Sequence, residues 1–130
     1  MIRREYLRIV ALLTFSVLLL ARSQAYGVQP TRFTFTPTFQ DPDPGKRQWE
    51  KRGNEYIEKL PSGRVNTFKI QKQGVVNGLR GTIIQKVSEP NFFVFVADTE
   101  AKRPELWWWR DKGPWKFMGV MKDVGPHIID

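Results

Sequence analysis

The chain has 130 residues, of which 21 are basic and 13 acidic, and it contains one histidine and no cysteine. This length permits a single domain, and the absence of cysteine excludes a disulfide framework, a thiol nucleophile and a thiolate zinc site. The net charge of +8 favours anionic partners, although it is too small to indicate nucleic acid.

Residues 1–25 have the segment order of a secretory signal peptide. A basic start at Arg3-Arg4 precedes an apolar run over residues 9–21, and Ser23 and Ala25 occupy the −3 and −1 positions of a cleavage site. The run has about 13 residues, fewer than the ~20 that a spanning helix needs. The start also resembles the twin-arginine export motif, but the strongly apolar run favours the general secretory route. We expect cleavage after Ala25 and export to a periplasmic or extracellular location, in a bacterium because the chain lacks disulfides.

Residues 26–46 are expected to form an irregular, proline-rich arm. Phe33, Phe35 and Phe39 alternate with threonines, which is compatible with an edge strand. Four prolines in the same stretch favour instead an extended, partly polyproline segment. The sequence leaves open whether these phenylalanines dock on the domain that follows.

Residues 47–122 are expected to form one antiparallel β domain, because short apolar runs alternate with turn signals at roughly ten-residue spacing. Gly53-Asn54 and the stretch 61–63 predict tight turns, and residues 74–78 predict a glycine-bounded loop. Gly81 predicts a bulge or a close backbone approach inside its strand. The seven expected strands cover residues 48–51, 55–60, 65–71, 79–87, 92–97, 106–110 and 115–120.

These strands and their short connections predict an up-and-down antiparallel meander that closes as a barrel or packs as a sandwich. Residues 92–97 lack polar alternation, so that strand should be central and covered on both faces. Residues 123–130 are expected to be a C-terminal tail, since Gly125-Pro126 stops a strand. The expected core includes Tyr56, Phe68, Ile70, Ile84, Phe93, Phe95, Trp108 and Phe117.

The densest aromatic stretch predicts a β-hairpin in which residues 111–114 form the loop. In that register Arg110 pairs with Trp115, and Trp108 pairs with Phe117. Trp108 and Phe117 then share the core-facing side. The opposite side carries Trp107, Trp109 and Lys116, which are expected to contribute to an exposed surface.

Aromatic and basic side chains on one hairpin predict a binding surface, because indole faces stack on sugars and basic groups attract anions. Without residues 1–25 the chain keeps 17 basic and 12 acidic residues. We therefore expect a non-enzymatic, secreted binding module for an anionic glycan, an envelope protein or a membrane surface. The candidate ligand-binding residues are Trp107, Trp109, Lys116, Arg110 and Lys112.

Catalytic chemistry has little support in the sequence. His127, the only histidine, lies in the expected tail, and Asp98 and Glu100 lack the dense spacing of a calcium loop. We predict no catalytic residue, no metal site and no cofactor. The alternative is a small hydrolase acting on an envelope or polysaccharide substrate through two acids, for which Glu58 and Glu105 are the nominees.

Overall fold

The structure, a computed structural model, describes residues 28–38 and 43–125. The expected signal peptide and most of the expected tail lie outside these residues. Within the described ranges every regular element is a β-strand, and no helix there is both long and apolar enough to cross a membrane.

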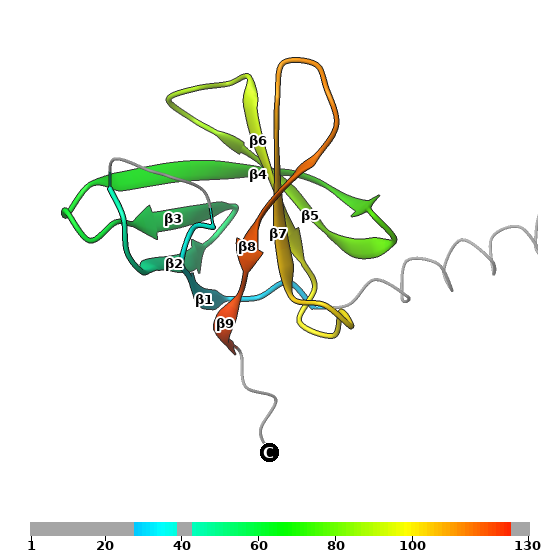
Figure 1. Cartoon of the computed structure of the whole chain (residues 1–130), viewed down its shortest axis with the longest axis horizontal. Coiled ribbons are helices and arrows are strands. Elements are labelled where there is room, and N and C mark those ends of the chain that lie inside the picture. The colour runs from blue at the N-terminus through cyan, green and yellow to red at the C-terminus, as the bar shows by residue number, and fades with distance from the viewer. Residues whose placement is uncertain (1–27, 39–42, 126–130) are drawn as a thin grey trace, which may run out of the picture.

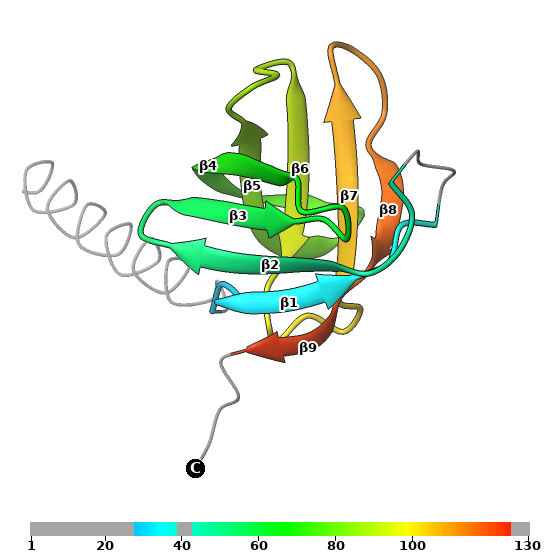
Figure 2. The same cartoon turned by 90° about the vertical axis from the view of Figure 1, so that its left-hand side faces the viewer.

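All neighbouring strands pair antiparallel in one sheet with the order β8-β7-β6-β5-β4-β3-β2-β1-β9. The predicted all-β meander is therefore confirmed, and it curls into a nearly closed barrel (Figure 1). In Figure 2, strands β1 to β3 run across strands β6 to β8, which shows how strongly the sheet coils. The strands are β1 (Arg32–Phe35), β2 (Arg47–Arg52), β3 (Glu55–Lys59), β4 (Val65–Val76), β5 (Leu79–Lys86), β6 (Phe92–Ala97), β7 (Glu105–Arg110), β8 (Lys116–Val120) and β9 (Lys122–Gly125).

Strands β8 and β9 bring the barrel close to closure, because they stand at opposite ends of the strand order yet are separated in the chain by Met121 alone. β9 pairs with β1, with Arg32 opposite Gly125. On the other side, the backbone N–H of Thr38 donates to the carbonyl of Met118 at 3.5 Å. Residues 122–125 thus form a strand, which corrects the tail expected from residue 123 onward. Their local sequence carries no strand signal, and the pairing with β1 supplies the missing stabilisation.

Part of the proline-rich segment also belongs to the barrel. Phe33 and Phe35 in β1 are 2% and 1% exposed, and Phe33 stacks on Trp49 with ring centroids 5.3 Å apart. Just before the strand, the carbonyl of Pro30 accepts a hydrogen bond of 2.6 Å from the hydroxyl of Tyr56. Burial of two aromatic rings outweighs the extended-coil preference that the neighbouring prolines bring.

The predicted core is partly right. Tyr56, Phe68, Ile84 and Phe95 are buried, whereas Phe117 is 39% exposed, which corrects its assignment to the core. Ile70, Phe93 and Trp108 are half-buried. The prediction omitted the buried residues Phe33, Phe35, Trp49, Leu106 and Met118.

Two glycine predictions have different outcomes. A Cβ on Gly81 would lie 2.3 Å from the carbonyl oxygen of Val96 and 2.6 Å from the Phe95 ring, so the predicted close approach is confirmed. The register shift occurs on the neighbouring strand, between Ile70 and Lys72. The loop expected at 74–78 is wrong, because β4 continues to Val76 and a tight turn at Asn77-Gly78 with positive φ joins it to β5.

Strand β6 is central, as its apolar sequence predicts, since it pairs with β5 on one side and β7 on the other. Residues 94–97 are all 0% exposed. Val94 and Val96 face the barrel interior, and Phe95 faces outward, where it packs against the Trp115 ring with centroids 6.3 Å apart at an interplanar angle of 71°. This strand is therefore covered on both faces.

Candidate functional site

One end of the barrel contains a small cavity, which we call the barrel mouth. In an antiparallel meander the starts of even-numbered strands and the ends of odd-numbered strands lie at the same end of the sheet. Residues from these ends enclose a volume of about 260 Å³. The lining residues are Arg47, Glu58, Arg64, Asn66, Phe68, Lys86, Phe92, Trp108, Arg110 and Met118.

The strand register explains why polar side chains point into this end. Glu58 lies opposite the buried Trp49 across β2 and β3, and Lys86 lies opposite the buried Phe68 across β4 and β5. Residues directly opposite one another in a sheet share a face. Glu58 and Lys86 therefore project to the same interior side as the aromatic core, but nearer the open end.

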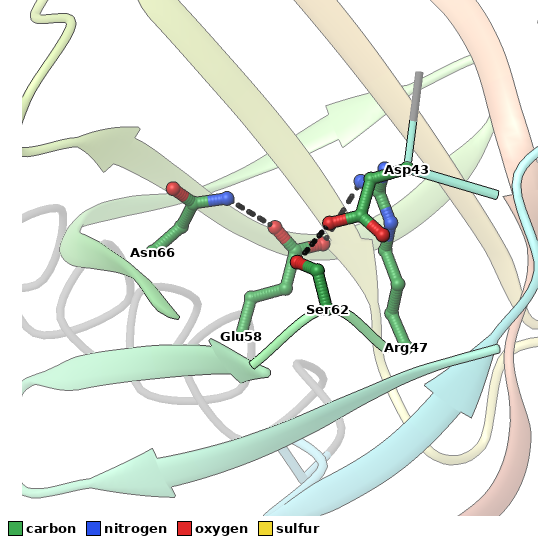
Figure 3. Close-up of polar contacts among 5 residues, drawn as sticks. All are labelled: Asp43, Arg47, Glu58, Ser62 and Asn66. Atoms are coloured by element: carbon green, nitrogen blue, oxygen red, sulfur yellow. Dashed lines mark hydrogen bonds and ion pairs between the residues drawn. The ribbon is translucent and has the colours of Figure 1, made fainter. Parts of the chain in front are cut away.

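The base of the mouth is a buried polar group (Figure 3). Nη1 of Arg47 lies 3.4 Å from Oε2 of Glu58, and Nδ2 of Asn66 donates to Oε1 of Glu58 at 2.8 Å. The Arg47 and Glu58 side chains are only 7% and 2% exposed. Burial raises the pKa of Glu58 above its ordinary value, against the lowering effects of Asn66 and Arg47. The carboxylate is thus held by two partners in a place that disfavours its charge.

A second contact fixes the chain beside this group. The hydroxyl of Ser62, in the turn between β3 and β4, donates to the carboxylate of Asp43, which lies shortly before β2 (Figure 3). Ser62 Oγ also accepts a hydrogen bond of 3.3 Å from the backbone N–H of Arg64. These contacts tie together two loops at the same end of the barrel as the mouth.

Aromatic rings on the wall hold cations in place. Phe92 and Trp108 stack with centroids 5.9 Å apart at an interplanar angle of 23°. The Arg110 guanidinium lies 5.0 Å from the Phe92 centroid, and Nζ of Lys116 lies 5.0 Å from that of Trp108. Nζ of Lys86 lies 5.8 Å from Phe92. Such cation–π contacts restrain long basic side chains without neutralising their charge.

Positive charge exceeds negative charge at this site. Arg47, Arg64, Lys86 and Arg110 line the cavity, and Glu58 is the only acid that does so among the described residues. At the rim, Arg110 also pairs with Glu89 at 2.7 Å. Among the described residues, Arg64 and Lys86 have no carboxylate within ion-pair distance. An anion entering the mouth would meet two cations that form no ion pair with a described carboxylate.

The structure divides the predicted hairpin site between two surfaces. Trp107 pairs with Phe117 and Trp108 with Lys116, so the predicted register is wrong by one residue. The turn runs to Trp115 rather than Pro114, and the register shifts again between Leu106 and Trp107. Consequently Lys116 accompanies Trp108 at the mouth, and Phe117 lies on the outer surface.

Of the predicted residues, Arg110 lines the mouth and Lys116 borders it through Trp108. Lys112 is exposed in the hairpin turn and does not line the cavity. Trp107 and Trp109 are half-buried on the outer face. Their indole N–H groups donate within the same hairpin, to Glu105 at 3.1 Å and to the carbonyl of Gly113 at 2.6 Å.

The two nominated catalytic acids do not meet. Glu58 faces the interior, whereas Glu105 lies on the outer face of β7, where it accepts from Trp107 and lies 3.8 Å from Arg103. Two acids on opposite faces of a sheet cannot flank one glycosidic bond. Among the described residues no group of three or more acidic, histidine or cysteine side chains could hold a metal ion. His127 lies outside the described residues.

A larger groove lies elsewhere, but its lining residues carry charges of both signs. It has a volume of about 810 Å³ over β1, β2 and β3, and its charged lining residues are Arg32, Glu50, Lys51, Lys59 and Asp123. Opposite charges alternate there, so the groove offers no consistent preference for a ligand of one sign. The barrel mouth combines enclosure with an excess of one charge.

The fold and the site together define a small antiparallel β-barrel with a cationic, aromatic-walled cavity at one end. Comparisons with protein-family models, with curated proteins and with solved structures found no match for the chain. Sequence reasoning missed Arg47, Arg64, Asn66 and Lys86. Each lies at or next to the end of an expected strand, and only closure of the barrel brings these ends together.

Proposed function

We propose that this protein is a non-enzymatic binding module that takes an anionic group into the barrel mouth. The observation that carries the proposal is the convergence of four basic residues on a cavity that one acid lines. Arginine and lysine donate charge-assisted hydrogen bonds to carboxylate, sulfate and phosphate oxygens. Such contacts are strongest at the buried base of the mouth, because charges interact more strongly where water is excluded.

The size of the cavity limits what can enter. Its volume of about 260 Å³ lies below the roughly 300–1,000 Å³ of sites for drug-sized ligands. One charged group, or one sugar-sized ring, fits better than an oligomer. We propose that the protein is exported, so an acidic sugar of an envelope glycan and a lipid phosphate headgroup are the two sources of such a group.

The hairpin contributes to this function through its inward-facing residues. Trp108 forms the wall, and Arg110 and Lys116 are held against its ring. Trp107 and Trp109 support the hairpin from outside, where their indole N–H groups are already used. An indole without a free N–H offers a ligand only its exposed ring surface, so we assign these two residues a supporting role.

Calorimetric titration of the full chain tests the proposal. Galacturonate, glycerol-3-phosphate and inorganic sulfate are the anionic probes, and galactose and glycerol are their uncharged counterparts. We expect binding of anions alone, with an affinity that falls as salt rises. The stronger of galacturonate and glycerol-3-phosphate indicates whether a glycan or a headgroup is the source.

Substitution of Lys86 should weaken anion binding in a way that a matched substitution elsewhere does not. Lys86→Gln removes one charge-assisted contact, worth about 1.5–3 kcal/mol, so we expect at least a tenfold loss of affinity. Lys69→Gln removes the same charge from an exposed position on β4 and should leave binding unchanged. Equal affinities of the two variants, or equal binding of galactose and galacturonate, would refute the proposed site.

A further inference from the structure

Glu58 places a negative charge inside a cavity that otherwise attracts anions. It is 2% exposed and, in the part of the chain that the structure describes, it is the only acid lining the mouth. Building on the proposed function, we infer that the mouth binds its anionic ligand together with a proton, which Glu58 takes up. The ionised Glu58 carboxylate then opposes binding of the anionic ligand, so the affinity of the site depends on the pH.

Glu58 is the group whose protonation can remove a negative charge from the mouth when an anion binds. Among the described residues that line the mouth, the charged or polar groups around Glu58 are cationic or neutral. Asp43, an acid beside this group, is outside the lining, and its carboxylate accepts a hydrogen bond from Ser62. Phe92 and Trp108 from β6 and β7, and Met118 from β8, complete the wall without a titratable group. The polar groups around Glu58 are Arg47 from β2, Arg64 from the β3–β4 turn, Asn66 from β4, Lys86 from β5 and Arg110 from β7.

The ionised Glu58 would repel a second anion beside it strongly, because Glu58 is 2% exposed and little water screens its charge. Protonation of Glu58 removes one of the two charges. The neutral carboxyl group can still accept from Asn66, whose Nδ2 lies 2.8 Å from Oε1. The positive charge of Arg47, whose Nη1 lies 3.4 Å from Oε2 of Glu58, is then no longer offset by a charge on Glu58.

Burial supports this exchange, since it raises the pKa of the Glu58 carboxyl and so makes the proton easier to acquire. By linkage, a ligand that favours the protonated form raises that pKa further, and a proton raises the affinity for the ligand by the same factor. Where the proton is taken up fully, affinity changes tenfold per pH unit.

The test is calorimetric titration of the full chain with inorganic sulfate between about pH 5 and about pH 8, a range in which sulfate keeps its charge. We expect the affinity of the unmodified protein to rise at least tenfold toward the acidic end. Glu58→Gln should bind sulfate at about pH 8 as tightly as the unmodified protein does at about pH 5, and its affinity should not vary with pH. Glu105→Gln and His127→Gln should keep the original pH dependence.

The outcomes separate this inference from the proposed function. Sulfate binding with no pH dependence, or with the same pH dependence in Glu58→Gln, overturns the proton coupling and leaves anion binding in place. Absence of binding by either protein to sulfate or galacturonate at every pH overturns the proposed function. If Glu58→Gln fails to fold, titration of the unmodified protein in two buffers of different ionisation enthalpy counts the protons directly, and a count of zero refutes the coupling.

Discussion

Glu58 is the least exposed carboxylate among the described residues, and its burial affects folding as well as binding. A buried acid whose folded-state pKa is raised stabilises the fold fully below its unfolded-state pKa. That contribution is lost as the pH rises through the folded-state value. Here the rise in pKa comes first from desolvation, and Asn66 and Arg47 offset only part of it.

The stability difference between the unmodified protein and Glu58→Gln should therefore depend on pH. We expect the unmodified protein to lose stability relative to the variant as the pH rises from about 4 to about 7, since Glu58 must then ionise inside the barrel and a glutamine at this position does not. Urea unfolding of both proteins across this range measures the difference. A difference that stays constant, or that changes in the opposite direction, would show that Arg47 and Asn66 fully compensate the burial.

Gly81 shows how a single residue can be read from sequence. A glycine inside a strand indicates that another group comes close, and here a carbonyl oxygen and the Phe95 ring occupy the space of a side chain. The same logic failed for Gly74, whose sequence neighbours resemble a loop. Gly74 lies within β4 opposite Gly81, where a Cβ would meet only the flexible end of Ile83.

Strand β1 is a structural part of the barrel rather than a peripheral segment, so its phenylalanines should be essential for stability. Phe33→Ala removes a ring that is 2% exposed and stacks on Trp49, and we expect a loss of about 3–5 kcal/mol. Thr36→Ala, at an exposed position just after the strand, should change stability by less than about 0.5 kcal/mol. Urea unfolding followed by tryptophan fluorescence checks both values; equal effects would mean that β1 is not stably docked.

The sequence predicted those elements whose cause is local. Gly53-Asn54 and Gly63 both lie in tight turns, with φ of +59° at Gly53 and +92° at Gly63. The apolar stretch of β6 is buried on both faces. In each case the residues that determine the structure are adjacent in the chain, so the local pattern of side chains is enough to predict the element.

What the sequence could not predict depends on distant partners. β1 and β9 have weak strand signals, and each is stabilised by pairing with the other. The hairpin register was wrong by one residue, because alternation fixes which residues share a face only when the loop length is known. The basic residues of the mouth are separated along the chain, and no local pattern marks them as one site.

Closure by β9 should contribute to the stability of the entire barrel. Deletion of residues 122–130 leaves β1 with an unpaired edge, and we expect a loss of at least about 2 kcal/mol, because each buried backbone hydrogen bond contributes about 0.5–1.5 kcal/mol. Deletion of residues 126–130 alone keeps β9 and should have a much smaller effect. Thermal unfolding by circular dichroism compares the two truncations, and identical melting temperatures would contradict a stabilising role for β9.

The pairing of β1 with β9 also has a consequence in time. The contact between Thr34 and Asp123 joins positions 89 residues apart in sequence. During synthesis β1 can therefore pair with β9 only after the residues of β9 have been made. Long-range pairing of this kind also forms slowly. A chain that stays open until β9 has been made would therefore suit the export that we propose, because translocation by the general secretory route requires an unfolded chain.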